Sequence, residues 1–195
     1  SRTTDTPVRR NREPNGSLAP AEHPPEALRV RTVRIALAGC GVVGSEFARL
    51  VHEARASVPG VRLEIVRVLV RDPARARRVP LPGSRFTTDL SEFLREPAHV
   101  VVEAMGGLHP AERIAREALA RGARLVTANK ALVGAAGDEL AELAASAGGT
   151  LDFEAAVGGG VPMIRTLRAG LGRRPVHGIR GILNGTTNYV LTLLE

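Results

Sequence analysis

Residues 33–44 read Val-Arg-Ile-Ala-Leu-Ala-Gly-Cys-Gly-Val-Val-Gly, and this stretch decides the fold. Its first half is mostly apolar and stops at Gly39, which is typical of a buried strand. Its second half has the spacing Gly-x-Gly-x-x-Gly. Apolar residues then recur at helical spacing from Ser45 to about Ala56, and a second apolar run occupies 63–70. The order strand, glycine loop, helix, strand predicts a βαβ unit with parallel strands.

Strands and helices continue to alternate along the chain. The pattern predicts further strands at 99–103, 124–127 and 150–154, and further helices at 89–94, 110–122, 138–147 and 162–171. It indicates an α/β protein of the Rossmann type, with a doubly wound, mainly parallel sheet. A strand at about 176–183 and a helix from Thr186 predict the beginning of a second, α+β substrate domain. We therefore expect a disordered leader at 1–30, a Rossmann domain at 31–157 and an incomplete second domain at 158–195.

Composition excludes several classes of protein. The chain has 195 residues, of which 44% are apolar, and one cysteine, Cys40. No run approaches the roughly 18 consecutive apolar residues that span a membrane. A single cysteine forms no intramolecular disulfide, which fits a reducing compartment. We expect a cytoplasmic protein with no membrane partner.

The basic charge has a simple explanation. The formal net charge is +7, yet the arginines are scattered, and four Phe and one Tyr are available to stack on bases. Of the 27 basic residues, one is a lysine, Lys130. We therefore predict solvated charged faces and no nucleic-acid partner.

The glycine loop predicts a dinucleotide site, because it follows a strand and opens a helix. Gly39 permits the tight turn, Gly41 lets a pyrophosphate approach the backbone, and Gly44 lets the helix pack close to the sheet. Cys40, Val42 and Val43 complete the loop, whose free N–H groups and helix dipole attract phosphate. The alternative is a glycine-rich turn in another doubly wound protein.

The residue after the second strand selects the cofactor. An acidic side chain there bonds the ribose 2′-hydroxyl of NAD, whereas an arginine accommodates the 2′-phosphate of NADP. Here Arg71 precedes Asp72, so we predict that NADP(H) is preferred, with NAD(H) left open as a second cofactor. The alternative is a solvent-exposed Arg–Asp turn.

Lys130 occurs in the segment Thr127-Ala128-Asn129-Lys130, where a parallel strand is predicted to end. Ligands bind at this edge of open α/β sheets. Because arginine replaces lysine everywhere else in the chain, a lysine here indicates a need for a compact ammonium that can give up a proton.

Five segments, in this order, resemble homoserine dehydrogenase: Gly-Cys-Gly-Val-Val-Gly at 39–44, Val-Val-Glu-Ala-Met-Gly-Gly at 101–107, Thr-Ala-Asn-Lys at 127–130, Phe-Glu-Ala-Ala-Val-Gly-Gly-Gly-Val-Pro-Met-Ile at 153–164, and Ile-Leu-Asn-Gly-Thr-Thr-Asn-Tyr at 182–189. The last two are far more specific than the glycine loop. That family reduces L-aspartate 4-semialdehyde to L-homoserine with NAD(P)H, on the route to threonine, methionine and isoleucine. The resemblance implies the same hydride transfer here.

The resemblance also implies roles for particular residues. Lys130 lies beside the nicotinamide and the substrate as the catalytic residue, and Thr127, Met105 and Gly106 contribute to the cofactor site. A monovalent cation, sodium, is held by carboxylate or carbonyl oxygens of four residues: Glu154, Val157, Gly159 and Val161. The resemblance further suggests a homodimer in the full-length protein. Apart from it, the glycines at 158–160 read as a hinge between domains.

The end of the chain departs from the family pattern. The acidic residues that hold the substrate amine and a second lysine are expected downstream of Glu195. We therefore expect a fragment that binds NADP(H) but turns over the semialdehyde poorly. Two other readings stay open: another NADP-dependent semialdehyde or amino-acid dehydrogenase, and a non-catalytic NADP(H)-binding module. A covalent thioester mechanism is disfavoured, because Cys40 is placed at the pyrophosphate.

Overall fold

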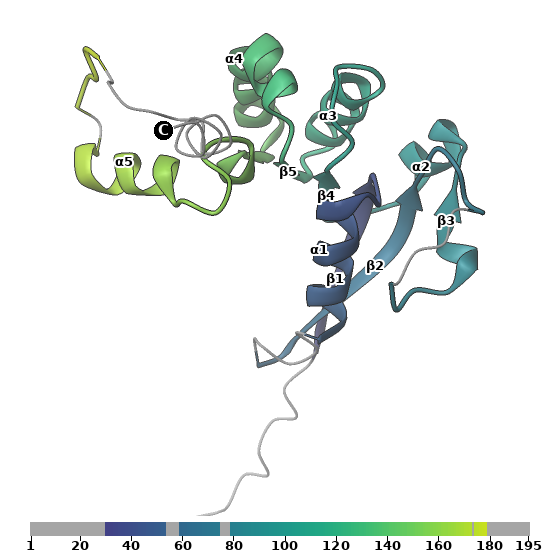
Figure 1. The fold of residues 1–195 in the computed structure, drawn as a ribbon. Coiled ribbons are helices and arrows are strands. Elements are labelled where there is room, and N and C mark those ends of the chain that lie inside the picture. Colours follow the sequence, from purple (N-terminus) through teal and green to yellow (C-terminus); the bar gives the residue numbers. More distant parts are fainter. Residues whose placement is uncertain (1–29, 54–58, 75–78, 173, 179–195) are drawn as a thin grey trace, which may run out of the picture.

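A six-stranded parallel sheet forms the centre of the computed structural model, which describes residues 30–53, 59–74, 79–172 and 174–178 (Figure 1). Its strands are β1 (Arg31–Ala38), β2 (Val61–Leu69), β3 (Phe86–Thr87), β4 (Val100–Glu103), β5 (Arg124–Thr127) and β6 (Thr150–Asp152). They are ordered β3-β2-β1-β4-β5-β6, which is the doubly wound order of a Rossmann fold. The predicted fold class is confirmed. The order reverses between β1 and β4, where such sheets bind ligands.

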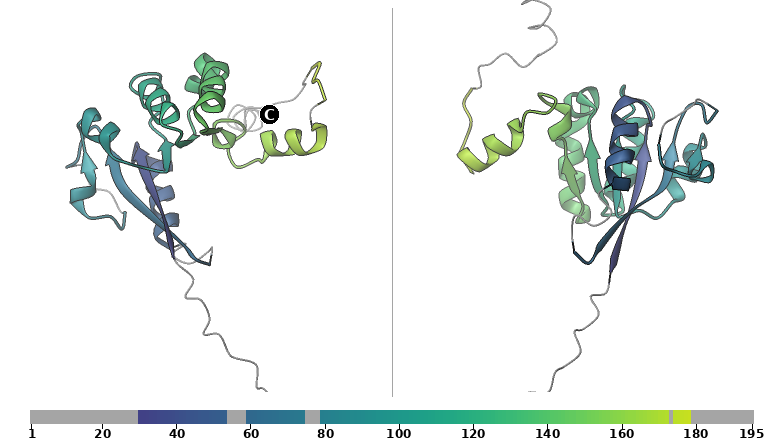
Figure 2. Two further views of the ribbon diagram at one scale, coloured as in Figure 1. Left: turned by 180° about the vertical axis from the view of Figure 1, so that it is seen from behind. Right: turned by 60° about the horizontal axis from the view of Figure 1, so that its bottom comes forward.

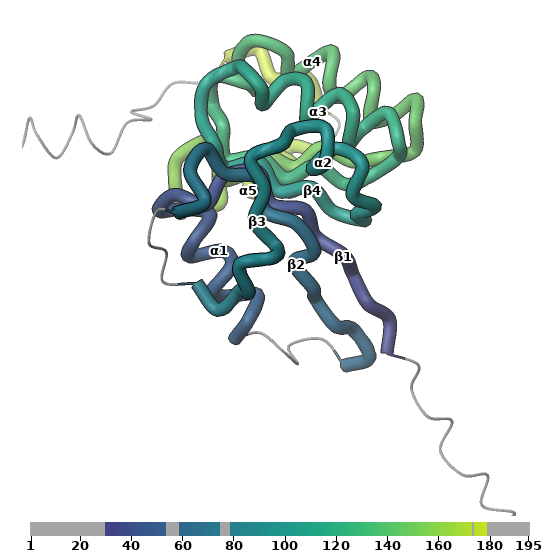
Figure 3. The backbone as a smooth tube through the Cα atoms, turned by 90° about the vertical axis from the view of Figure 1, so that its right-hand side faces the viewer, coloured from purple at the N-terminus to yellow at the C-terminus, as the bar shows by residue number. Residues whose placement is uncertain are grey.

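Helices cover both faces of the sheet (Figure 3). On one face lies α1 (Val42–Glu53); on the other lie α2 (Leu90–Arg95), α3 (Ala111–Ala120) and α4 (Lys130–Ala147). Strand β1 serves both layers, because Leu37 packs with the α1 layer whereas Ala36 and Ala38 pack with the other helices. This alternation follows from the two-residue period of a strand.

Helix α4 is longer than the sequence predicted, because it begins at Lys130 and not near residue 138. The side chain of Asn129 caps it by accepting from Leu132 N at 3.2 Å. Its buried residues recur every four positions, at 132, 136, 140 and 144, but half of them are alanines. Alanine and glycine give little contrast in hydropathy, so the periodic signal is weak before residue 138.

Other boundaries differ by smaller amounts. Strand β3 was not predicted, since it has two residues. Strand β6 ends at Asp152 and not at Glu154, which begins the 3-10 turn η2 (Glu154–Ala156). A second 3-10 turn, η1 (Gly83–Arg85), precedes β3. The short helix α2 is confirmed, with Asp89 accepting from two backbone N–H groups as its cap.

Beyond the sheet, helix α5 (Met163–Leu171) stands apart from the other helices (Figure 2). Of the strand predicted at about 176–183, residues 176–178 are described and have no regular structure, and the rest lies outside the described residues. The leader expected at 1–30, apart from Val30, and the helix expected from Thr186 also lie outside them. Within the described part of the chain, none of the helices combines the length and apolar character needed to cross a bilayer.

Many of the scattered arginines pair with carboxylates. Arg67 bonds Glu96 at 3.1 Å, Arg116 bonds Glu139 at 2.6 Å, and Arg124 bonds Asp152 at 2.7 Å. These pairs are partly exposed and screened, so each contributes little to stability. They do neutralise part of the positive charge locally.

Candidate functional site

The glycine loop has the geometry that its three glycines predict. Gly39 has φ +95°, and a Cβ there would lie 2.7 Å from the Ala104 carbonyl oxygen. A Cβ on Gly44 would lie 2.0 Å from the Gly39 oxygen, so helix α1 packs directly on the loop. A Cβ on Gly41 would have no neighbour within 4 Å, which leaves the backbone at this position open to a ligand.

The first turn of helix α1 presents backbone N–H groups that have no partner within the helix beside this open backbone. Its first intrahelical bond runs from Ser45 N to the Gly41 oxygen at 2.9 Å, so the N–H groups of Val42, Val43 and Gly44 precede the ladder. The first turn holds no acidic side chain. Ser45 also donates its hydroxyl to the Cys40 carbonyl at 3.3 Å, which fastens the loop. The donors and the helix dipole together favour a phosphate group.

A cleft of about 780 Å³ opens over the loop. Six predicted cofactor residues line it: Gly39, Cys40, Gly41, Arg71, Met105 and Gly106. The other predicted ones, Val42, Val43, Gly44, Thr127 and Lys130, do not. Val42 and Val43 are exposed at the first turn of α1, whereas Thr127 is fully buried. The cleft therefore covers the glycine loop and the end of β2, where the adenosine half of a dinucleotide lies in this fold, and it extends to the residues that follow β4.

Arg71 and Asp72 follow β2 at one end of the cleft. Arg71 is exposed. One carboxylate oxygen of Asp72 accepts from Ala74 N at 2.8 Å, which closes a turn. The turn occupies part of the acceptor capacity of Asp72, whereas the Arg71 guanidinium is placed at the cleft.

Helix α4 follows β5 (Figure 1), and Lys130 is its first residue, so it lies at the carboxyl ends of the strands, the same edge of the sheet as the glycine loop. Its side chain is exposed, and none of the carboxylates in the described part of the chain pairs with it. A cation at a helix N-terminus opposes the helix dipole, which costs about 0.3–1 kcal/mol. The position is therefore unfavourable for stability and favourable for attracting a negative charge.

Two residues at this edge were not singled out from the sequence, Glu103 and Asn129. Glu103 is 0% exposed; its carboxylate accepts from Thr127 Oγ1 at 2.6 Å and from Met105 N at 2.8 Å. Asn129 donates its amide to the Gly107 oxygen at 2.6 Å. For Glu103, the sequence did offer a signal of a functional role, because a charged residue ends an otherwise apolar strand.

The four residues predicted to hold sodium lie between β6 and α5. The Glu154 carboxylate accepts from Ile164 N and Arg165 N, each at 2.9 Å, and so caps the first turn of α5. The carbonyls of Glu154 and Val161 each accept one backbone bond, from Val157 N at 3.2 Å and Met163 N at 2.8 Å. Those of Val157 and Gly159 accept none from the described residues.

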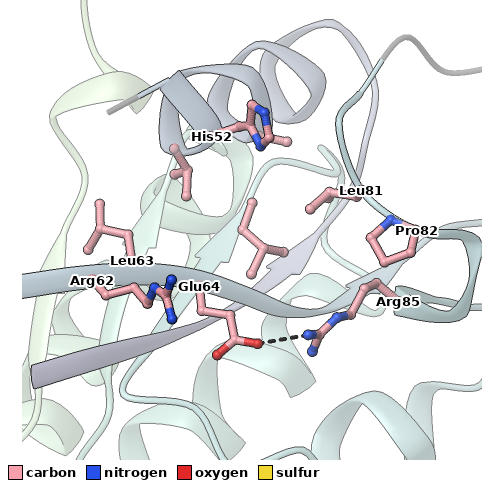
Figure 4. Close-up of a pocket in the computed structure, with 10 residues that line it drawn as sticks. His52, Arg62, Leu63, Glu64, Leu81, Pro82 and Arg85 are labelled. Atoms are coloured by element: carbon pink, nitrogen blue, oxygen red, sulfur yellow. Dashed lines mark hydrogen bonds and ion pairs between the residues drawn. The ribbon is translucent and has the colours of Figure 1, made fainter. Parts of the chain in front are cut away.

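A second hollow, of about 440 Å³, lies between the end of α1 and the first half of β2 (Figure 4). An ion pair between Glu64 and Arg85, 2.7 Å long, crosses its rim. This hollow is at the amino ends of the strands, away from the glycine loop. We therefore assign it no part in the site.

Fold, glycine loop and cleft together define a dinucleotide-binding domain of the Rossmann type. Comparison with known families is more specific. Residues 39–154 match the family model "Homoserine dehydrogenase, NAD binding domain", and residues 162–195 match the model "Homoserine dehydrogenase". The chain belongs to the homoserine dehydrogenase family.

Individual relatives agree with this assignment. The chain is 42% identical over 163 residues to homoserine dehydrogenase of Synechocystis, and 35% identical over 167 residues to that of Bacillus subtilis. These alignments cover 83% and 84% of this chain, but 38% and 39% of the relatives. The crystal structure of a homoserine dehydrogenase from Thiobacillus denitrificans superposes with a TM-score of 0.72 at 36% identity, over 84% of this chain and 39% of that one. The chain thus spans less than half the length of these relatives.

Proposed function

We propose that this chain supplies the NADP(H) site and one catalytic residue, Lys130, for the reduction of L-aspartate 4-semialdehyde to L-homoserine. One observation carries the proposal: the 2.6 Å bond from Asn129 to the Gly107 oxygen places the start of α4, and so Lys130, against the loop after β4. That loop borders the cofactor cleft through Met105 and Gly106. The family assignment supplies the reaction.

The reaction needs a hydride and a proton. The residues of the glycine loop and the cleft would hold the reduced nicotinamide cofactor, which would supply the hydride for the aldehyde carbon of the substrate. The carbonyl π electrons then move to the oxygen, and the Lys130 ammonium stabilises this developing alkoxide and donates the proton that completes the alcohol. The N-terminal N–H groups of α4 add positive potential at the same place.

The overall proposal is tested with two preparations. Titration calorimetry of NADPH into the 195-residue chain is expected to give one site per chain. The protein expressed from the complete gene is expected to oxidise NADPH only when the semialdehyde is present, at roughly 1–10³ per second. Binding without turnover would instead favour a non-catalytic nucleotide-binding module, and absence of binding would overturn the assignment.

Cofactor preference rests on Arg71. Replacing Arg71 with alanine is expected to weaken NADPH binding about tenfold, because a charge-assisted bond to the 2′-phosphate is lost. NADH has no such phosphate, so its dissociation constant is expected to stay within about twofold. Calorimetry with both cofactors measures the change.

The matched control is Arg113→Ala, which removes an exposed arginine on α3 paired with Glu117 at 3.8 Å. It is expected to leave both affinities unchanged. If Arg71→Ala weakened NADH as much as NADPH, the assignment of Arg71 to the 2′-phosphate would be wrong.

We extend the proposal to a sodium ion held by main-chain carbonyls of Glu154, Val157, Gly159 and Val161. In the described part of the chain, His, Cys, Asp and Glu side chains form no group of three or more that could hold a metal ion. Carbonyl oxygens are hard donors that suit sodium, and two of these four accept no bond from described residues. The Glu154 carboxylate is engaged by α5, which favours its carbonyl as the ligand.

Removing sodium is expected to lower stability. At about ten times its dissociation constant, a ligand specific to the folded state adds about 1.4 kcal/mol. Thermal melts in sodium chloride and in choline chloride at equal ionic strength measure this increment. In Glu154→Gln the increment is expected to persist while the baseline melting temperature falls, because the cap of α5 is weakened. Loss of the increment in that variant would instead make the carboxylate the ligand.

The remaining parts of the proposal concern organisation and partners. We place the domain boundary near residue 157, supported by the two family models that match on either side of 155–161. We propose a homodimer for the complete protein and a place in the cytoplasm. We also propose that it binds neither nucleic acid nor membrane, supported by the pairing of arginines with carboxylates.

A further inference from the structure

We propose that Glu103, Thr127 and Asn129, here called the strand-end network, position Lys130 against the loop after β4 and so shape the nicotinamide end of the cofactor site. The inference rests on the proposed function, since it concerns the same site. None of the three residues lines the cleft. Each acts through a bond to another group, so they are positioning residues and not catalytic ones.

Glu103 joins two strand ends. Its carboxylate accepts from Thr127 Oγ1 at 2.6 Å and from Met105 N at 2.8 Å. Glu103 and Thr127 are direct partners in the pairing of β4 with β5, so their side chains lie on the same face of the sheet. That face is the one covered by α3 and α4. One carboxylate thereby holds the start of the loop after β4 to the end of β5.

Asn129 extends the connection to the helix. Its backbone N–H donates to Thr127 Oγ1 at 3.0 Å, and its side-chain amide donates to the Gly107 oxygen at 2.6 Å. Its side-chain oxygen meanwhile caps α4 through Leu132 N. A single side chain thus fixes both the loop after β4 and the first turn of α4, where Lys130 is the next residue.

The buried polar side chains of Glu103 and Asn129 lie where they support the cofactor site. A buried carboxylate is costly unless it is hydrogen-bonded, and within the described residues no cation pairs with Glu103. The three residues before it in β4 are valines, which fill the sheet without that cost. The backbone groups that the Glu103 and Asn129 side chains hold, Met105 N and the Gly107 oxygen, flank the loop at the cleft. Gly106 and Gly107 in that loop have positive φ and need external support to keep one conformation.

Three substitutions distinguish a role of the network in positioning Lys130 from a role in stabilising the fold. Thr127→Val keeps the shape of the side chain and removes the hydroxyl. Thr127→Ser keeps the hydroxyl and is the matched control. Asn129→Asp keeps the oxygen that caps α4, because aspartate is as good a cap as asparagine, but removes the donor to Gly107.

Two ligands report on the two ends of the site. Calorimetry is expected to show about tenfold weaker NADPH binding in Thr127→Val and Asn129→Asp, because the loop beside the nicotinamide is no longer held. 2′,5′-ADP carries the adenosine half and lacks the nicotinamide. Its affinity is expected to stay within about twofold in every variant, and Thr127→Ser is expected to bind both ligands like the parent chain.

Lys130 itself gives a direct readout, because it is the one lysine in the sequence. Reductive methylation with ¹³C-formaldehyde labels it and the N-terminal amine while keeping the charge. In the parent chain, NADP⁺ is expected to shift the Lys130 methyl resonance. At saturating NADP⁺ the shift is expected to fall by at least half in Thr127→Val and Asn129→Asp, and to return in Thr127→Ser.

Several results would overturn the inference. NADPH binding unchanged in both folded variants would leave the network without a role in the site. If the variants bound NADPH and 2′,5′-ADP equally more weakly, the strand-end network would be a general support of the fold. The same would follow if NADP⁺ shifted the Lys130 methyl resonance in the variants as much as in the parent chain. If the parent chain bound neither ligand, the proposed function would fail before any variant was measured, and the network assignment would fall with it.

Discussion

Replacing Gly44 with alanine is expected to destabilise the chain by about 2 kcal/mol or more and to abolish detectable NADPH binding. The added Cβ would lie 2.0 Å from the Gly39 carbonyl oxygen, which is backbone and cannot rotate away. Alanine gains about 1 kcal/mol over glycine within a helix. Because the contact is with backbone, the cost of forcing helix α1 off the loop is expected at the upper end of the range for overpacking, about 3 kcal/mol, so the clash outweighs the gain. Urea or thermal unfolding measures the difference.

Gly41→Ala provides the contrast within the same loop. The added Cβ would meet nothing within 4 Å, so stability is expected to be unchanged or slightly higher. The methyl group would, however, stand where the pyrophosphate approaches the backbone. NADPH binding is therefore expected to weaken about 10- to 100-fold in a folded protein.

Gly137→Ala, in the middle of α4, is the control outside the loop, since its Cβ would meet an ordinary contact at 3.5 Å. Stability is expected to rise by up to about 1 kcal/mol, with NADPH binding unchanged. A folded Gly44→Ala that bound NADPH normally would contradict the packing described for α1.

The parts of the fold set by strong local signals could be predicted from the sequence. The second half of strand β1, residues 35–38, is an uninterrupted apolar run that stops before Gly39, because this half is buried on both faces of the sheet. The roles of Gly39, Gly41 and Gly44 follow from what a tight turn, a ligand and a packed helix each require. The structure matches each of the three geometries.

The parts set by tertiary contacts could not. The start of α4 depends on the Asn129 cap, within an alanine-rich segment where hydropathy does not alternate clearly. Glu103 ends a strand of valines, and sequence alone does not say whether it is exposed or buried with partners. The Glu154 carboxylate has the right chemistry for a cation, yet the fold brings the N-terminus of α5 to it, ten residues along the chain. In each of these cases the role of the side chain depends on which backbone or side-chain group the fold brings into contact with it.

Lys130→Met is expected to lower kcat for semialdehyde reduction about 10³-fold, measured in the protein expressed from the complete gene. Removing a group that stabilises a developing alkoxide costs about that much in other enzymes. The substitution is expected to leave the dissociation constant of NADPH within about threefold, because the phosphates are held at α1. Steady-state kinetics and calorimetry separate the two effects.

The same substitution is expected to raise stability, by about 0.3–1 kcal/mol, because it removes a cation from the positive end of α4. A residue kept for packing would do the opposite, so the signs of the two changes distinguish a catalytic role from a structural one. Lys130→Arg keeps the positive charge, unlike Lys130→Met, but lacks the compact, proton-donating ammonium. Its activity is expected to be about 100-fold lower than that of the parent protein. Full activity in Lys130→Arg would reduce the role of Lys130 to electrostatics, and full activity in Lys130→Met would remove it from the reaction.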